Sequence, residues 1–253
     1  MSGIVNLDEV VESWAWDMFY TTASDKQKKI PKDALALKIN WKKVNFVHEG
    51  PDYEDNKKSS KPQNQVLFKS NFTNETEQEQ DYSFRTERVT RSTCEVFYEK
   101  GYSMGYEMSI TLKTPCEVFE ANSGFHREIN VNKCEGEIVE EEMTWGVDNQ
   151  IRVPAKHKCV AELVISEEQF SSNFTIITTF EGQVHVVFTN MSDNNSFVKA
   201  VDGEIGQIFK DKGKKYRCFT VDGGKVSVET KGTTKFRYGI EQHVRVHQEP
   251  LDY

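Results

Sequence analysis

The chain has 253 residues, a formal net charge of −8 at pH 7 and 37% hydrophobic residues. The acidic balance argues against a nucleic-acid-binding protein, because binding to phosphates needs a clustered positive field. The modest apolar content is less than a compact enzyme usually carries, and it suits long, thin sheets with much solvated surface. No run approaches the roughly 20 apolar residues that a membrane-spanning helix needs.

The first residues, Met1 to Glu9, lack the basic and apolar regions of a signal peptide. Three interpretations follow: a cytosolic protein, a protein that leaves the cell by an unconventional route, or a chain whose leader has been removed.

Residues 6–20 have the pattern of a helix. Asn6 and Glu9 have the spacing of a capping box. Apolar residues at helical spacing predict one apolar face, formed by Leu7, Val10, Val11, Trp14 and Met18. This face either packs on a sheet, or the aromatic residues form an exposed cluster that binds a lipid or glycan surface; those residues are Trp14, Trp16, Phe19 and Tyr20.

Strand patterns begin near residue 35, where apolar and polar residues alternate up to Trp41. A polar loop at 49–64 follows, and it is the predicted module boundary. Beyond it the segments have little helical character, and some are far longer than the usual five or six residues of a strand. The predicted strand segments are 65–72, 81–114, 125–153, 156–166, 174–190, 216–221, 225–230 and 235–247.

Residues 104–134 predict a hairpin. Its apolar positions are Tyr106, Met108, Ile110 and Leu112 on the way out, Val118 and Phe119 in the connection, and Phe125, Ile129 and Val131 on the return. Arg127 interrupts the apolar side of the return strand. The same alternation is required of any half-buried antiparallel hairpin and of a hairpin that spans a membrane, so periodicity leaves both interpretations open.

Three segments, in this order, carry a resemblance to a known family. A polar lead-in occupies 71–80, an aromatic and glycine-containing segment occupies 100–106, and a strand with a proline turn occupies 149–160. In this order and spacing, over about three quarters of the chain, the sequence resembles the aerolysin-like β-pore-forming proteins, in particular the epsilon-toxin and mosquitocidal-toxin group.

The resemblance implies a mainly β, elongated fold of long, twisted antiparallel strands with one short N-terminal helix. It implies an N-terminal head at 1–64 that recognises a target, and a pore-forming module at 65–253 with the insertion hairpin at 104–134. It also implies a secreted protein that binds a membrane lipid, glycan or protein receptor, forms a homo-oligomer and opens a transmembrane β-barrel pore as a toxin or in defence. The alternative is a non-lytic, lectin-like or structural binding protein of the same fold, which would also suit a cytoplasmic location.

Charged residues set this hairpin apart from the Ser- and Thr-rich hairpins of that family. A dense acidic run follows it, comprising Glu135, Glu137, Glu140, Glu141 and Glu142. One hypothesis is that these carboxylates repel one another at neutral pH and that acid favours assembly by relaxing the repulsion. The other interpretation is a solvated strand face.

No sequence motif of an enzyme is present, whether a nucleophile elbow, a phosphate-binding loop or a zinc-binding helix. We therefore expect no enzyme, no cofactor and no metal. His243 and His247 would lie about 13 Å apart on one strand, too far to share an ion. Five cysteines, an odd number, leave at least one thiol unpaired within the chain.

Overall fold

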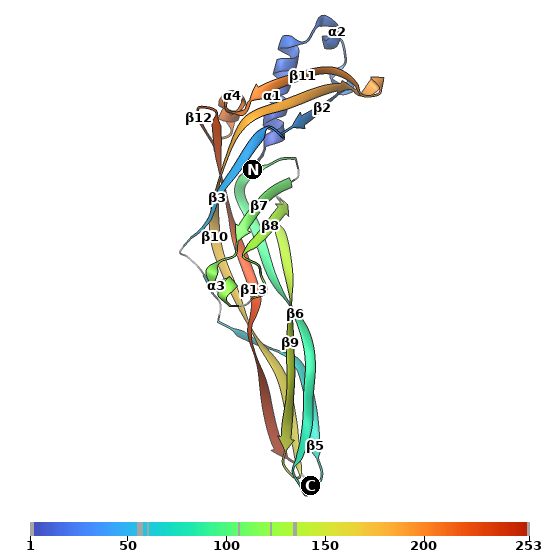
Figure 1. Ribbon diagram of the computed structural model, residues 1–253, viewed down its shortest axis with the longest axis vertical. Helices are drawn as coiled ribbons and strands as arrows, with labels where there is room; N and C mark the ends of the chain where they lie inside the picture. Colours follow the sequence, from blue (N-terminus) through green and yellow to red (C-terminus); the bar gives the residue numbers. More distant parts are fainter. Residues whose placement is uncertain are drawn as a thin grey trace.

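The computed structural model describes residues 3–54, 58–59, 61–105, 107–121, 123–133 and 136–251. The molecule is elongated, with α1 at one end and the C-terminus at the other (Figure 1). The helices are α1 (Leu7–Thr22), α2 (Asp25–Lys28), α3 (Cys116–Glu120) and α4 (Ile205–Asp211). The strands are β1 (Gly3–Asn6), β2 (Leu35–Asn40), β3 (Val44–Tyr53), β4 (Lys58–Ser59), β5 (Gln63–Asn74), β6 (Gln80–Ser103), β7 (Glu107–Lys113), β8 (Glu128–Lys133), β9 (Glu137–Val153), β10 (His157–Asn190), β11 (Ser196–Glu204), β12 (Phe219–Asp222) and β13 (Lys225–Pro250).

Very long strands dominate the fold, which confirms the predicted mainly β class. Strand β10 has 34 residues and pairs antiparallel with the 26-residue β13, from His157 opposite Pro250 to Glu181 opposite Lys225. The sequence divided each of these strands into two segments. They are continuous because alternation persists through the gap in β10, where Phe170 and Ser172 are buried.

The end of the molecule that contains the C-terminus, which we call the tail, is a small two-layer sandwich (Figure 1). Strands β5, β10 and β13 are hydrogen-bonded side by side, and β6 pairs with β9. Phe68 of β5 stacks on Phe84 of β6 with ring centroids 5.7 Å apart. Leu163 of β10 and Ile151 of β9 complete this core. Strand β13 leaves β6 after the pair Arg237 and Thr93, and from there the two layers face one another.

The opposite end of the molecule contains another core, formed by residues of α1, β2, β10, β11 and α4. We call this end the head. Helix α1 buries its apolar side against β2, β11 and α4, and its Phe19 packs on Phe188 of β10. Phe180 and Phe209 belong to the same core, with ring centroids 5.2 Å apart. This core draws on residues 180–228 as well as on the N-terminal residues, whereas the predicted head contained only residues 1–64. Target recognition by residues 1–64 stays a prediction.

The N-terminal helix is confirmed, with corrections. It spans 16 residues, and the Asn6 side chain caps it by accepting a hydrogen bond from the Asp8 N–H, 2.9 Å away, rather than from Glu9 as a capping box requires. The structure adds three helices that the sequence did not indicate, α2, α3 and α4. Helix α4 buries Ile205, Ile208 and Phe209 on one side. Its 7 residues are too few for helical periodicity to be recognised in the sequence.

The polar loop predicted at 49–64 is shorter in the structure. Strand β3 continues to Tyr53 and β5 begins at Gln63. Pairing with β10 explains the extension, since Tyr53 lies opposite Phe174 across the ladder. Tertiary pairing therefore overrides the local turn signal of Gly50 and Pro51.

Asn74, at the tail end of β5, is fully buried and ties two turns together. Its side-chain N–H groups donate to the carbonyl oxygens of Gln78, Val153 and Pro154, and its oxygen accepts from Thr76. We expect Asn74→Ala to lower the free energy of unfolding by about 2–4 kcal/mol, because it leaves buried carbonyl groups without partners. Urea denaturation measures this. Asn71→Ala, at an exposed position of the same strand, is the matched control, and an equal loss in both variants would contradict the prediction.

Candidate functional site

The predicted hairpin forms a sheet of its own. Strands β7 and β8 pair only with each other among the described residues, with Ile110 opposite Val131 and Leu112 opposite Ile129. The hairpin lies beside the long strands at mid-length of the molecule, with α3 in its connection (Figure 1). It is therefore attached to the main sheet by side-chain packing and by a few hydrogen bonds, with no continuous ladder.

The apolar side of the hairpin is buried against that sheet. Ile110, Leu112, Val118, Phe125, Ile129 and Val131 each expose 5% or less of their surface. They share a core with Cys94 and Val96 of β6 and with Phe170 and Phe236 of the long strands. Phe125 meets Phe236 edge to face, with ring centroids 5.4 Å apart. The alternation seen in the sequence thus corresponds to a docked and an exposed side.

The connection between the strands differs from the predicted turn. Residues Cys116–Glu120 form helix α3, with Val118 fully buried and Phe119 38% exposed. Arg127 precedes the first residue of β8, so it does not occupy an inward strand position, and its guanidinium lies 5.4 Å from the Phe119 ring centre. Tyr106 lies outside the described residues, and only the backbone of Met108 is described.

A few polar contacts fasten the hairpin at its ends. The Tyr53 hydroxyl of β3 donates to the Lys113 carbonyl at 2.5 Å, and burial raises the pKa of Tyr53. The Asn132 N–H donates to a Glu137 carboxylate oxygen at 2.7 Å. Within the hairpin, the Thr111 hydroxyl donates to the Asn130 side-chain oxygen at 3.0 Å.

The acidic run lies on β9, except for Glu135, which lies outside the described residues. Arg91 of β6 sits between Glu140 and Glu142, with nitrogen-to-oxygen distances of 3.6 and 3.7 Å. Glu137 accepts the hydrogen bond from the hairpin, and Glu141 is partly buried. Arg91 therefore offsets part of the predicted repulsion. Activation by acid stays a prediction.

The aromatic residues of α1 do not form one exposed cluster. Phe19 is only 1% exposed and packs on Phe188, so it belongs to the core. Trp14 is half-buried, beside Gly203. Tyr20 is 48% exposed and stacks on Trp16 with ring centroids 5.9 Å apart. The helix thus packs on a sheet, and of the four aromatic side chains only Tyr20 is largely open to a partner.

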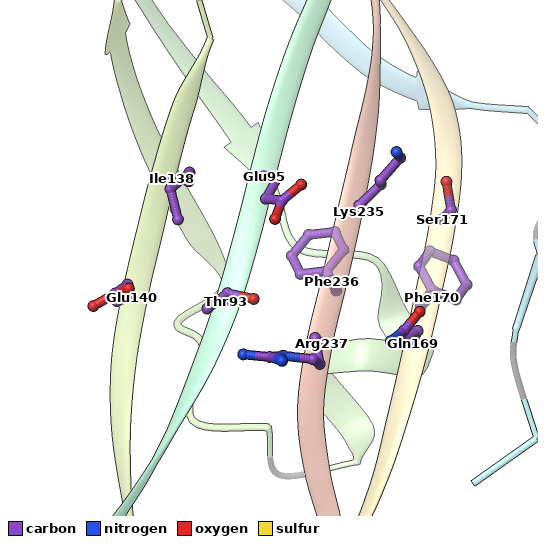
Figure 2. A pocket seen from close by; sticks show the side chains of 10 residues that line it. All are labelled: Thr93, Glu95, Ile138, Glu140, Gln169, Phe170, Ser171, Lys235, Phe236 and Arg237. Carbon is purple, nitrogen blue, oxygen red and sulfur yellow. The ribbon is translucent and has the colours of Figure 1, made fainter. Parts of the chain in front are cut away.

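The face of the sheet opposite the hairpin is uncovered and mixed in character, with Ile138 61% exposed among charged and polar side chains. Figure 2 shows the shallow cleft there, lined mainly by Thr93, Glu95, Ile138, Glu140, Gln169, Ser171, Lys235 and Arg237. Strand alternation places these side chains away from Cys94 and Phe236, which face the hairpin. The cleft is open and carries both charge signs, and it does not bring together the groups of a recognisable catalytic site.

Other features of the described residues bear on chemistry. No group of three or more His, Cys, Asp or Glu side chains in the described ranges could hold a metal ion. No helix there is long and apolar enough to cross a membrane. Cys94, Cys116, Cys159 and Cys218 are free thiols, and burial raises the pKa of Cys94 to about 12.

We expect His48 of β3 to make the stability of the fold depend on pH. Its Nδ1 lies 3.0 Å from the Thr178 hydroxyl, and burial lowers the pKa of His48 below 6.5. The unfolded chain therefore takes up this proton at a higher pH than the folded chain does. We expect the free energy of unfolding to fall as the pH drops through 6.5 and to level off below the lowered pKa. Denaturation between pH 7.5 and pH 5 should show a shallower slope in His48→Gln; an unchanged slope would refute this role.

Comparisons with known proteins agree on the fold. No family model and no curated protein matches the sequence. A non-toxic crystal protein from Bacillus thuringiensis matches with a TM-score of 0.57 and 16% identity, covering 98% of each chain. The Cry23Aa1 and Cry37Aa1 binary complex matches with a TM-score of 0.52 and 14% identity, covering 99% of this chain and 91% of that one. At such identities the likeness concerns the fold alone, and it establishes that this chain has an aerolysin-like fold.

Proposed function

We propose that the protein binds a target membrane, oligomerises and inserts residues 104–134 as a β-hairpin into a shared transmembrane barrel. One observation carries the proposal: the hairpin is a separate two-stranded sheet whose apolar side is held against the protein's own body. Such a hairpin can leave without breaking a continuous backbone ladder. In a membrane its apolar side would exchange contact with the sheet for contact with lipid.

Insertion requires the hairpin to lengthen. Strands β7 and β8 have 7 and 6 residues, fewer than the roughly 9–11 that a membrane-spanning strand needs. The connection between them, with α3, supplies the missing residues. Helix α3 therefore unwinds on insertion, and buried Val118 and half-exposed Phe119 become strand residues.

Departure of the hairpin would also uncover the sheet beneath it. Cys94, Phe170 and Phe236 would become exposed along three neighbouring strands. An apolar surface of this kind is unfavourable in water. A second copy of the chain is the natural cover, so hairpin release and oligomerisation would proceed together.

Dye release from liposomes made with target-cell lipids tests the proposal. We expect leakage accompanied by oligomers that resist SDS. Absence of both, on membranes that demonstrably bind the protein, would overturn it. The head presents Tyr20 and Trp16 as candidate contacts to a membrane lipid, glycan or protein receptor.

A second candidate is a non-lytic binding protein of the same fold. Two observations favour it: the similar crystal protein from Bacillus thuringiensis is described as non-toxic, and charged residues such as Lys113 and Glu128 lie on the exposed side of the hairpin. Charges are costly to carry into a barrel lumen, although Lys113 and Glu128 have opposite signs and lie opposite each other across the two strands. Binding to a glycan array without leakage would select this candidate.

A further inference from the structure

The side chain that caps helix α1 also holds the start of the hairpin. The Asn6 oxygen accepts hydrogen bonds from the Asp8 N–H at 2.9 Å and from the Gly105 N–H at 3.3 Å. Gly105 has a φ of +62°, a left-handed conformation that favours glycine, and it lies two residues before Glu107, where β7 begins. One acceptor thus joins the first turn of the head helix to the point where the chain enters the hairpin.

Strand β1 reinforces this junction. Residues 3–6 pair in parallel with residues 100–103 of β6, so β1 ends beside the last residues before Gly105. The strand fits closely, because a Cβ atom added to Gly3 would lie 2.4 Å from the Glu99 carbonyl oxygen. The chain entering the hairpin is therefore fixed by the N-terminus, whereas the rest of the hairpin is held mainly by side-chain packing.

The first turn of α1 connects to the head on its other side. The Trp41 indole N–H donates to an Asp8 carboxylate oxygen at 2.8 Å, and Trp41 lies between β2 and β3. Further along, α1 buries Val10, Val11 and Phe19 in the head core. A displacement of α1 against the head would pull on Asn6, and through Asn6 on Gly105.

We propose that Asn6 is a positioning residue that couples the head helix to the hairpin and keeps the hairpin docked until α1 moves. Only the role of this coupling in hairpin release rests on the proposed function. The coupling itself is a property of the soluble protein. Loss of the Gly105 hydrogen bond alone should raise the population of undocked hairpin about five-fold, the effect of one ordinary hydrogen bond.

Two native thiols report undocking without any membrane. Cys94 is buried in the core that the hairpin covers, and its raised pKa keeps it protonated and unreactive while the hairpin is docked. Cys159 is buried in the tail sandwich, in a core that contains no residue of the hairpin, and it reports unfolding of the tail. The modification rates of both by a maleimide, measured by peptide mass spectrometry, separate hairpin opening from general loss of stability.

Three substitutions at residue 6 divide the two roles of Asn6. Asn6→Ser keeps a helix cap, which the existing Glu9 would complete as a capping box, but its hydroxyl is too short to reach Gly105. Asn6→Asp keeps both acceptor roles. Asn6→Ala removes both. Asn40→Ala is the matched control, because it removes another asparagine side-chain hydrogen bond to a backbone N–H of the head, that of Lys42 at 3.0 Å, without touching α1 or Gly105.

We expect Cys94 to react about five-fold faster in Asn6→Ser, with Cys159 unchanged, and at the wild-type rate in Asn6→Asp and Asn40→Ala. Equal Cys94 rates in Asn6→Ser and wild type, or parallel increases at both cysteines, would overturn the coupling. Liposome leakage is measured separately. Faster Cys94 labelling with no leakage in any variant would leave the coupling standing and reject the pore. Leakage with unchanged Cys94 labelling would support the pore and reject the coupling.

Discussion

Dye release from liposomes should stop when the hairpin is chemically tied to β3 and resume when the tie is cut. The tie joins Tyr53→Cys and Lys113→Cys through a short, thiol-cleavable bis-maleimide, with Cys116, Cys134 and Cys218 replaced by serine. The Tyr53 hydroxyl contacts the Lys113 carbonyl in the native protein, so the two positions lie within reach of such a linker. Because insertion requires β7 to leave β3, we expect loss of nearly all leakage in the linked protein.

A matched link should leave leakage intact. Thr111→Cys and Asn130→Cys lie opposite each other on β7 and β8, where cross-strand spacing suits a disulfide. This bond holds the two strands of the hairpin together but leaves the hairpin free to move as a unit. Full leakage from the protein tied to β3 would show that these residues do not move and would reject the insertion mechanism.

Truncation of the aromatic contact between hairpin and sheet should undock the hairpin selectively. Phe125 is 5% exposed and packs edge to face on Phe236. Replacing a buried phenylalanine by alanine lowers the free energy of unfolding by about 3–5 kcal/mol. Because Phe125 lies between the hairpin and the sheet, we expect the free energy of hairpin opening to fall by a similar amount. We expect Phe125→Ala to raise the rate of Cys94 modification about 100-fold or more, measured by peptide mass spectrometry.

Phe84→Ala is the comparison variant for this second experiment. Phe84 is also buried, but it packs on Phe68 in the tail, in the core that contains Cys159. It should therefore accelerate the labelling of Cys159 more than that of Cys94. If both variants accelerated both thiols to the same degree, the hairpin would open only when the whole protein unfolds, and independent release would be ruled out.

Part of the candidate site can be predicted from the sequence. The alternation of Ile110 and Leu112 with polar residues anticipates a strand with one buried side, and the return through Ile129 and Val131 anticipates its partner. The sequence does not indicate α3, because five residues with one buried side chain give too little periodicity. It also does not indicate that Phe19 is buried, since an apolar helix face has the same pattern whether or not a sheet covers it.

The sequence by itself determined the class of the fold, the N-terminal helix and the two faces of the hairpin, because each depends on a local period of 2 or 3.6 residues. Only the tertiary structure decided that β10 and β13 run unbroken, that residues 180–228 join the head core, and that Asn6 meets Gly105. These features depend on contacts between residues far apart in the chain. Local periodicity does not predict such contacts, because it specifies which side of a strand is apolar but not which residues cover that side.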